Sequence, residues 1–290
     1  MRALMFLGCT VPVRNLNYEL SARKVAAALG VELVDLAEMG CCGYPLKAFD
    51  QEAALVLAAR ALAQAGRTGL TVVPLCSSCA GTLNEAAHHL DHDPAALAQV
   101  QEKLKPLGLT YRPGVRVRHL ARYLLEEVGL EAIAGKIVRP LSEFTFAPHY
   151  GCHLLKPSRV MEGFDDPENP TSLARLIEVT GAKALDYRYL KQCCGGGVLG
   201  ADEDLAGRMA GSKLLELTEA RVAAMVVICP FCNVMYEGQQ KAVAKKLGAE
   251  IKVPVVYLTQ VLGLAMGMSP DELGFKLNRV KPKELLAAFK

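Results

Sequence analysis

Short apolar runs alternate along the chain with longer segments in which apolar residues recur at helical spacing. Residues 4–7, 32–36, 71–75 and 115–117 are rich in apolar or β-branched side chains and are predicted to form buried strands. Between them, residues 18–29 and 51–65 are rich in Ala and Leu with helical periodicity, which predicts helices. Strands that alternate with helices predict an α/β fold with a mostly parallel sheet covered by helices.

The segment from residue 80 to residue 115 breaks this alternation. It is polar enough to predict an excursion over the surface, and it holds His88, His89 and His92. Three neighbouring histidines are a candidate metal site, but we interpret them as solvated side chains because such spacings on an exposed stretch seldom bind metal.

The cysteines repeat in order along the chain. Each half carries one Cys, a vicinal pair and a Cys-x-x-Cys motif: a first set of Cys9, Cys41, Cys42, Cys76 and Cys79, and a second set of Cys152, Cys193, Cys194, Cys229 and Cys232. The surroundings repeat too, because residues 70–75 match residues 224–228 and residues 115–129 match residues 253–267. Two homologous halves, residues 1–145 and 146–290, are therefore predicted.

Composition and charge exclude several classes of protein. The 290 residues are 51% hydrophobic and 22% charged, which excludes a disordered chain and a coiled coil. The formal net charge of +3 gives no sign of a nucleic-acid-binding surface. The apolar stretch before Cys9 is too short for a signal peptide, and residues 253–268 are too short and interrupted for a membrane span. A cytoplasmic protein without a membrane span is expected.

The cysteines are the main indication of function in this sequence. Several cysteines follow predicted strands, and open α/β sheets bind ligands where their strands end. Structural disulfides fit poorly, because no secretion signal is present and five cysteines per half leave one unpaired. Structural zinc takes four ligands and leaves the fifth spare. Soft thiolates favour iron and inorganic sulfide, so five per half indicate either a free reactive thiol or a larger, irregular cluster.

The doubled order of Cys, Cys-Cys-Gly and Cys-x-x-Cys resembles the CCG-domain proteins, and nearly the whole chain is similar to the family of heterodisulfide reductase B-type subunits. Tyr150-Gly151-Cys152, followed by the FDDPENP sequence of residues 164–170, is typical of that family. The resemblance implies two homologous Rossmann-like α/β domains, tandem CCG domains related by internal duplication. It also implies two non-cubane [4Fe-4S] clusters, each held by one set of five cysteines.

The resemblance further implies that a disulfide is reduced, or formed, between the two clusters. Product thiols need protons, and polar residues near the ligands or at matched repeat positions are candidate donors: His153, Lys156, His149 and His119. Basic residues near ligands in sequence are candidate contacts for an anionic substrate: Lys47, Lys156, Arg159, Arg188 and Lys191. Ordinary solvated side chains are the alternative interpretation of both groups.

Electrons are expected to come from another chain. Gly195-Gly196-Gly197 follows a cysteine pair and not a strand, so the sequence has no dinucleotide fingerprint. By resemblance, the electron donor is a C-type subunit with cubane [4Fe-4S] clusters. A flavin-containing A-type subunit passes electrons to that C-type subunit. The stretch 269–290 either docks a partner or covers the core, and its basic residues are Lys276, Arg279, Lys281 and Lys283.

Two other functions stay open at this point. One is an electron-relay subunit of a lactate- or glycolate-linked, or fumarate- or quinone-linked, oxidoreductase. The other is a scaffold that binds zinc or transfers sulfur. Since the sequence carries no additional ferredoxin-type cysteine motif, a stand-alone B-type subunit is favoured.

Overall fold

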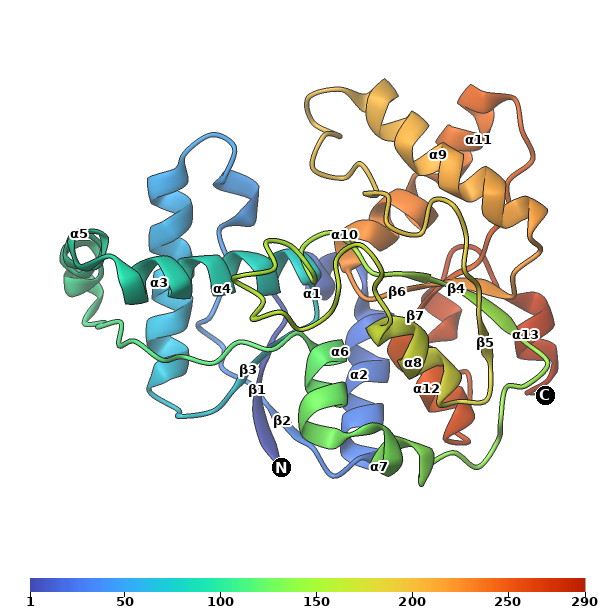
Figure 1. Ribbon diagram of the computed structural model, residues 1–290, viewed down its shortest axis with the longest axis horizontal. Coiled ribbons are helices and arrows are strands. Elements are labelled where there is room, and N and C mark those ends of the chain that lie inside the picture. The colour runs from blue at the N-terminus through green and yellow to red at the C-terminus, as the bar shows by residue number, and fades with distance from the viewer. Residues whose placement is uncertain (290) are drawn as a thin grey trace.

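The computed structural model describes residues 1–289, and its first half contains a small parallel sheet surrounded by helices (Figure 1). The strands of this half are β1 (Arg2–Phe6), β2 (Glu32–Val34) and β3 (Val72–Pro74). The α-helices are α1 (Val11–Arg14), α2 (Leu16–Ala28), α3 (Gln51–Gly66), α4 (Ser77–His92), α5 (Pro94–Leu104), α6 (Leu120–Tyr123) and α7 (Leu130–Ala134). Shorter turns are the 3-10 helices η1 (Tyr44–Leu46) and η2 (Lys105–Leu107) and the π-helical turn η3 (Leu124–Val128).

The second half is built in the same way. Its strands are β4 (Thr145–His149), β5 (Lys183–Ala184), β6 (Ala224–Val227) and β7 (Val255–Tyr257). Its α-helices are α8 (Ser172–Glu178), α9 (Glu203–Glu219), α10 (Pro230–Asn233), α11 (Gln240–Leu247), α12 (Leu258–Ala265) and α13 (Lys283–Ala287). The π-helical turn η4 (Val234–Gly238) follows α10, and the 3-10 helix η5 (Phe275–Leu277) precedes α13. Helices α9 and α11 lie on one side of the sheet, and α8 and α12 on the other (Figure 1).

Both sheets are parallel and share one strand order. The first sheet has the order β2-β1-β3, and the second has the order β5-β4-β6-β7. In the first sheet, the place of β7 is taken by a single bridge between Val72 and Val117, so the strand predicted at residues 115–117 is reduced to that bridge. Pro113 and Gly114, which directly precede it, both disfavour strands. The shared topology confirms the predicted α/β fold of two Rossmann-like halves.

The predicted helices at residues 18–29 and 51–65 are present as α2 and α3. Helix α3 begins where the Asp50 side chain accepts a hydrogen bond from the Ala53 N–H at 2.9 Å, and α9 begins in the same way with Asp202 and the Leu205 N–H at 2.8 Å. These caps identify α3 and α9 as equivalent helices of the two halves. Within residues 1–289, every helix is too short or too polar to cross a membrane.

Only the first part of the segment 80–115 departs from the predicted surface excursion, since residues 80–87 are mostly buried whereas residues 91–115 are mostly exposed. Helix α4 starts inside the protein, where Ser77, Ser78 and Thr82 are buried. Small side chains are needed there, since a Cβ on Gly81 would lie 3.0 Å from the Cβ of His153 in the second half. Hydropathy predicted exposure because it scores the polarity of Ser, Gly and Thr and not the close packing that their size permits.

The three histidines predicted to be solvated lie at the far end of α4. His89 is exposed, and the rings of His88 and His92 stack with their centroids 4.4 Å apart. His92 Nδ1 lies 2.7 Å from the His88 carbonyl oxygen. Their position in the last turn suits the negative end of the helix dipole.

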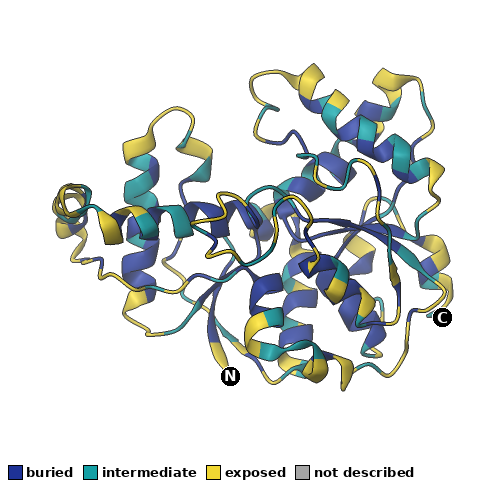
Figure 2. Ribbon diagram, viewed as in Figure 1, coloured by how far each residue is buried: buried dark blue, intermediate teal, exposed yellow. Residues whose placement is uncertain are grey.

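The two halves share one hydrophobic core (Figure 2). Where α2 packs against α12, the Tyr18 and Tyr257 rings stack with centroids 3.9 Å apart and an interplanar angle of 8°. The Tyr18 hydroxyl donates to the Ile228 carbonyl oxygen at 3.2 Å, and His119 Nε2 lies 2.9 Å from the same oxygen. Both donors come from the first half and the acceptor follows β6. These bonds therefore join the halves at the strand ends that carry cysteines.

Candidate metal centre

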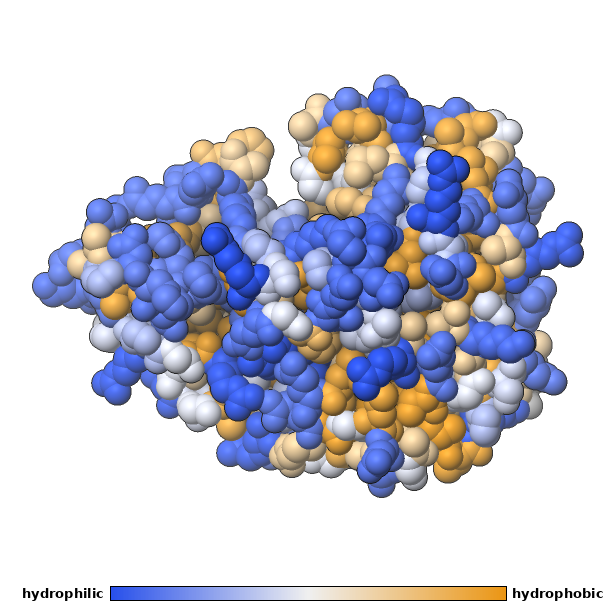
Figure 3. Space-filling view, in the orientation of Figure 1, coloured by the Kyte–Doolittle hydropathy of each residue, from blue (hydrophilic) through white to orange (hydrophobic). Residues whose placement is uncertain are grey.

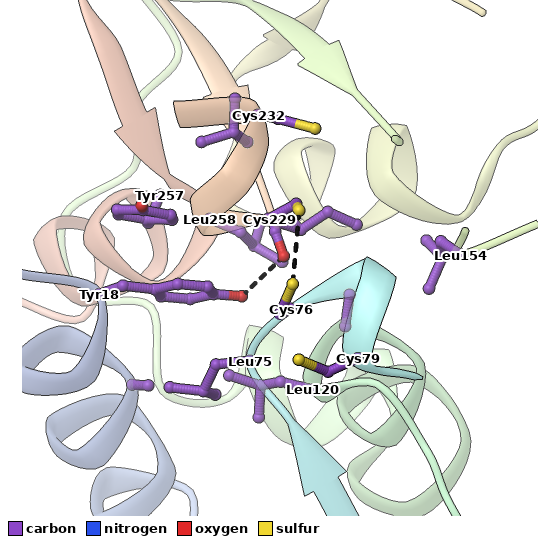
Figure 4. Packing of buried hydrophobic residues seen from close by; sticks show 14 of the residues in the cluster. Tyr18, Leu75, Cys76, Cys79, Leu120, Leu154, Cys229, Cys232, Tyr257 and Leu258 are labelled. Atoms are coloured by element: carbon purple, nitrogen blue, oxygen red, sulfur yellow. Dashed lines mark hydrogen bonds between the residues drawn. The ribbon is translucent and has the colours of Figure 1, made fainter. Parts of the chain in front are cut away.

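The cysteines of the two Cys-x-x-Cys motifs gather where β3 and β6 end (Figure 4). Cys76 follows β3 and Cys229 follows β6, and each is the N-cap of the next helix, α4 or α10. Their sulfur atoms lie 3.6 Å apart across the boundary between the halves. Free N–H groups in the first turn of each helix give these positions a partial positive charge, which favours thiolate.

All ten thiols form one row of neighbouring groups. Each thiol influences the pKa of the next in the order Cys9, Cys41, Cys42, Cys79, Cys76, Cys229, Cys232, Cys194, Cys193 and Cys152, and the two sets meet where the sulfur atoms of Cys76 and Cys229 lie 3.6 Å apart. Equivalent cysteines of the two sets appear in the same order from either end, so the row has the symmetry of the duplication. Within residues 1–289, His, Cys, Asp and Glu side chains nowhere form a group of three suited to a single metal ion. Rows of five soft donors suit a group with several iron atoms.

Backbone N–H groups also stabilise negative charge on the vicinal cysteines. The Gly43 N–H donates to Cys41 Sγ, and the Gly195 N–H donates to Cys193 Sγ, both at 3.4 Å. In the second half, the Gly196 N–H makes a further such bond to the neighbouring cysteine. Hydrogen bonds of this kind lower the energy of a thiolate and tune a metal bound to it.

Neighbouring thiols lower the pKa of selected cysteines. The pKa of Cys42 is lowered to about 4, chiefly because the Cys41 thiol and then the Cys79 thiol donate to its sulfur. The pKa of Cys193 is lowered in the same way, with Cys152 as the main donor. Each set therefore contains a cysteine whose surroundings favour the thiolate, which is the form that binds metal.

Glycines let the cysteine segments pack closely. A Cβ on Gly8, whose φ is +64°, would lie 2.9 Å from Cys79 Sγ. A Cβ on Gly43, whose φ is +90°, would lie 2.4 Å from the Ala54 carbonyl oxygen, and Gly195 repeats this contact against α9 at 2.9 Å. Soft donors in a row, backbone N–H groups and glycines beside the sulfur atoms all fit an iron–sulfur group in each half.

Two of the four predicted proton donors lie near the end of the row. His153 Nδ1 is 3.2 Å from Cys152 Sγ, and burial lowers the pKa of His153 below its ordinary value. Lys156 is exposed and forms an ion pair with Glu168 at 3.2 Å. His153 is thus the candidate in direct contact with a thiol.

The other two predicted donors are buried and hold structural contacts. His119 Nδ1 accepts from the Ala121 N–H at 3.1 Å, so Nε2 donates to Ile228, and burial lowers the pKa of His119 to about 4. His149 Nδ1 accepts from the Lys213 ammonium at 2.9 Å. Burial, and then the charge of Lys213, lower the pKa of His149 well below its ordinary value. The surroundings of both imidazoles therefore favour the neutral form.

The predicted anion contacts are spread over different surfaces. Lys47 forms an ion pair with Glu85 and lines a cavity of about 470 Å³ between α3, α4 and α5. Arg188 and Lys191 line a second cavity of about 440 Å³ beside β5. Arg159 is exposed. Lys156 and Lys191 nevertheless meet at one carboxylate, Glu168, at 3.2 and 3.5 Å, whereas Lys47 lines a different cavity.

Tyr44 is a residue of this site that the sequence analysis missed. It lies in η1 of the first half, yet its ring meets His153 edge-to-face at 5.1 Å and Phe231 at 6.2 Å. A Cβ on Gly197 would lie 3.2 Å from its hydroxyl oxygen. Burial and then the charge of Cys152 raise the pKa of Tyr44. Its place directly after the vicinal motif is a signal in the sequence that would have pointed to it.

The surface is hollowed above the junction of the two halves. Figure 3 shows the hollow between the lobe of α3 and α4 and the lobe of α9 and α11. The start of α4 and helix α10, which carry the two Cys-x-x-Cys motifs, lie beneath it (Figure 1). Ligands of a size to enter this hollow would approach both sets from one side.

The fold and the site define a duplicated cysteine-rich iron–sulfur protein, and known families agree. The CCG cysteine-rich domain matches residues 3–84 and residues 146–237. The B-type subunit of the ferredoxin:CoB-CoM heterodisulfide reductase of Methanosarcina mazei is 37% identical, over 98% of this chain and 95% of its own. A protein of Archaeoglobus profundus, named as similar to the same heterodisulfide reductase subunit, is 34% identical, over 93% and 92%. The chain belongs to the family of heterodisulfide reductase B-type subunits.

Two further similarities extend the comparison. The 8-methylmenaquinol:fumarate reductase membrane anchor subunit of Wolinella succinogenes is 30% identical over 97% of both chains. The crystal structure of a hypothetical protein from Helicobacter pylori superposes with a TM-score of 0.79 and 18% identity, over 97% of this chain and 52% of that one. At that identity the second similarity supports the fold alone.

Proposed function

We propose that the chain is a heterodisulfide reductase-like B-type subunit that reduces a disulfide, or forms one, at two non-cubane [4Fe-4S] clusters. The first set of cysteines would hold one cluster and the second set the other. The observation that carries this proposal is the row of ten thiols, whose two halves meet at Cys76 and Cys229. Disulfide cleavage takes two electrons, and two one-electron carriers that meet at one junction suit that requirement.

The chain's own residues would prepare this site. Clusters bound there would supply single electrons and a soft metal that stabilises a thiolate product. Tyr44 and Phe231 place aromatic surface beside the second set, in which Cys152 and Cys193 are partly exposed. His153, in contact with Cys152, is the proposed proton donor to a product thiol, and Lys156 is the exposed alternative.

Partners and domain division follow from the same proposal. Electrons would come from a flavin-containing A-type subunit through a C-type subunit that holds cubane clusters. The two domains would divide near residue 145. Residues 269–289 cover the core with Leu273, Phe275 and Leu285, which are all buried. The basic residues of this stretch are exposed, and among them Lys281 Nζ donates to the Phe275 carbonyl oxygen at 3.2 Å. Docking of a partner by this stretch stays a separate proposal.

Anaerobic purification followed by iron, zinc and acid-labile sulfide analysis tests the proposal. Iron and sulfide for two four-iron clusters per chain, with broad visible absorption, is the expected result. Incubation with a reduced dye and a coenzyme-type mixed disulfide should then release two thiols per disulfide. A colourless protein that contains zinc would contradict the proposal and favour the scaffold function.

An electron-relay function is the second candidate, and the Wolinella relative favours it. That relative is named as a subunit of a fumarate reductase and matches this chain over its whole length. A relay would hold the same clusters but would not react with disulfides. A fully iron-loaded protein whose reduced spectrum is unchanged by added mixed disulfides would support the relay over the reductase.

A further inference from the structure

Lys213 is a fully buried cation beside the second set. It lies in α9 with none of its surface exposed to solvent. Besides His149 Nδ1, its Nζ donates to the carbonyl oxygens of Gln192 and Leu190, at 3.0 and 3.2 Å. Gln192 directly precedes the vicinal pair, so the ammonium is anchored to the segment that carries Cys193.

The thiols of the second set are the main acidic groups around this ammonium. Burial lowers the pKa of Lys213 to about 7, whereas Cys232, Cys194 and Cys193 act in the opposite direction, with Glu216 a smaller influence. A buried charge is costly unless opposite charge lies nearby. Negative charge on the second set is therefore what stabilises a charged Lys213.

Two more hydrogen-bond donors near the second set lack partners. Because His149 Nδ1 accepts from Lys213, its Nε2 carries the hydrogen, and this buried atom has no partner within residues 1–289. The buried Tyr236 hydroxyl has none there either, and its ring meets His149 at 4.8 Å. Tyr236 stands four residues after Cys232 in the continuous helix of α10 and η4, so the two lie on one face of it. Burial and the charge of Cys194 raise the pKa of Tyr236. Buried donors without acceptors are destabilising, and sulfur atoms of a bound cluster are acceptors.

The first set has apolar residues at all three equivalent positions. Gly43 meets Ala54 and Gly195 meets Ala206, and seven residues after these alanines stand Ala61 and Lys213, respectively. By the same repeat, His149 corresponds to Phe6 and Tyr236 corresponds to Leu83, and both of these first-half side chains are fully buried. The charge of Lys213 and the donors of His149 and Tyr236 therefore have no counterpart at the equivalent positions of the first half.

We propose that Lys213, His149 and Tyr236 raise the reduction potential of the cluster held by the second set above that of the cluster held by the first. The inference rests on the proposed function, which supplies the two clusters. Positive charge and hydrogen bonds to sulfur stabilise an added electron. One electron delivered by the partner reductant would therefore settle on the second cluster, with no bond made or broken in that transfer.

An anaerobic redox titration of the full chain, followed by electron paramagnetic resonance, tests the inference. Lys213→Met keeps the length of the side chain and removes its charge. It should weaken electron binding at one cluster at least tenfold, a decrease of 59 mV for a one-electron couple, and leave the other unchanged. Cys193→Ser identifies the affected signal, because it removes a ligand of the second set alone. Lys252→Met, an exposed lysine of the same half, is the matched control and should shift neither potential.

Each outcome of this titration either supports or overturns one of the two proposals. Iron-loaded Lys213→Met protein with both potentials unchanged overturns the inference. If Lys213→Met fails to retain iron in the second set, Tyr236→Phe and His149→Phe replace it, and unshifted potentials in both overturn the inference as well. Wild-type protein without two four-iron clusters means instead that the proposed function fails. The two failures are thus distinguishable.

Discussion

Gly43 joins the vicinal pair of the first set to α3, and its replacement by alanine is expected to destabilise the protein. An added Cβ would lie 2.4 Å from the Ala54 carbonyl oxygen and 3.0 Å from the Ala54 Cα, and φ at Gly43 is +90°. A side chain in the left-handed region costs about 1–2 kcal/mol, and overpacking adds about 1–3 kcal/mol. Gly43→Ala should therefore lower the free energy of unfolding by about 2–5 kcal/mol.

Gly30 provides the matched control for this prediction. Its φ is +73°, and a Cβ there would meet no heavy atom within 4 Å. Gly30→Ala should therefore lose only the conformational part, about 1–2 kcal/mol. Urea unfolding followed by circular dichroism measures the free energy of unfolding of both variants. Iron analysis should show a loss of iron in Gly43→Ala alone. Equal stability losses with full iron in both variants would refute the reasoning, because the close approach of Gly43 to α3 would then constrain nothing.

Three other perturbations address the ligands, the substrate and the interface. Cys41→Ala should lose the iron of the first set and keep that of the second, and full iron content would contradict the five-cysteine assignment. Lys156→Ala should raise KM for an anionic disulfide at unchanged kcat, whereas an unchanged KM would exclude this lysine. The pKa of His119 falls from 6.5 to about 4 on folding, so the unfolded chain binds a proton that the folded chain does not. His119 should therefore contribute up to about 3 kcal/mol of stability that is lost as the pH falls from 6.5 to about 4, and His119→Asn should make the fall in the free energy of unfolding, measured by urea denaturation, smaller by that amount.

The parts of the fold that depend on short-range pattern could be predicted. Residues 4–7 and 71–75 form β1 and β3 because strands of a parallel sheet are buried on both faces and read as continuous apolar runs. The doubled cysteine order predicted the duplication, since two sequences with the same spacing of motifs adopt the same strand order. The place of the thiols at strand ends followed from the fold class.

The parts that depend on contacts between distant residues could not be predicted. Nothing near Tyr18 in the sequence indicates that its hydroxyl bonds to Ile228 in the other half. Lys213 reads as an ordinary lysine of an amphipathic helix, although it occupies the face that carries buried Ala210 and Leu214. The sequence did contain one indication, because a lysine on the apolar face of a predicted helix is unusual. Its partner could be found only once β4 and α9 were packed together.

The proposed chemistry depends on two iron clusters that are held by separate sets of cysteines and meet at one junction. A crystal structure of anaerobically purified protein, with anomalous scattering recorded at the iron edge, tests this most directly. We expect two separate groups of iron atoms, each bound by one five-cysteine set, that approach each other on the side of Cys76 and Cys229. A single shared group of iron, an empty set in iron-replete protein, or cystines in place of either set would contradict it.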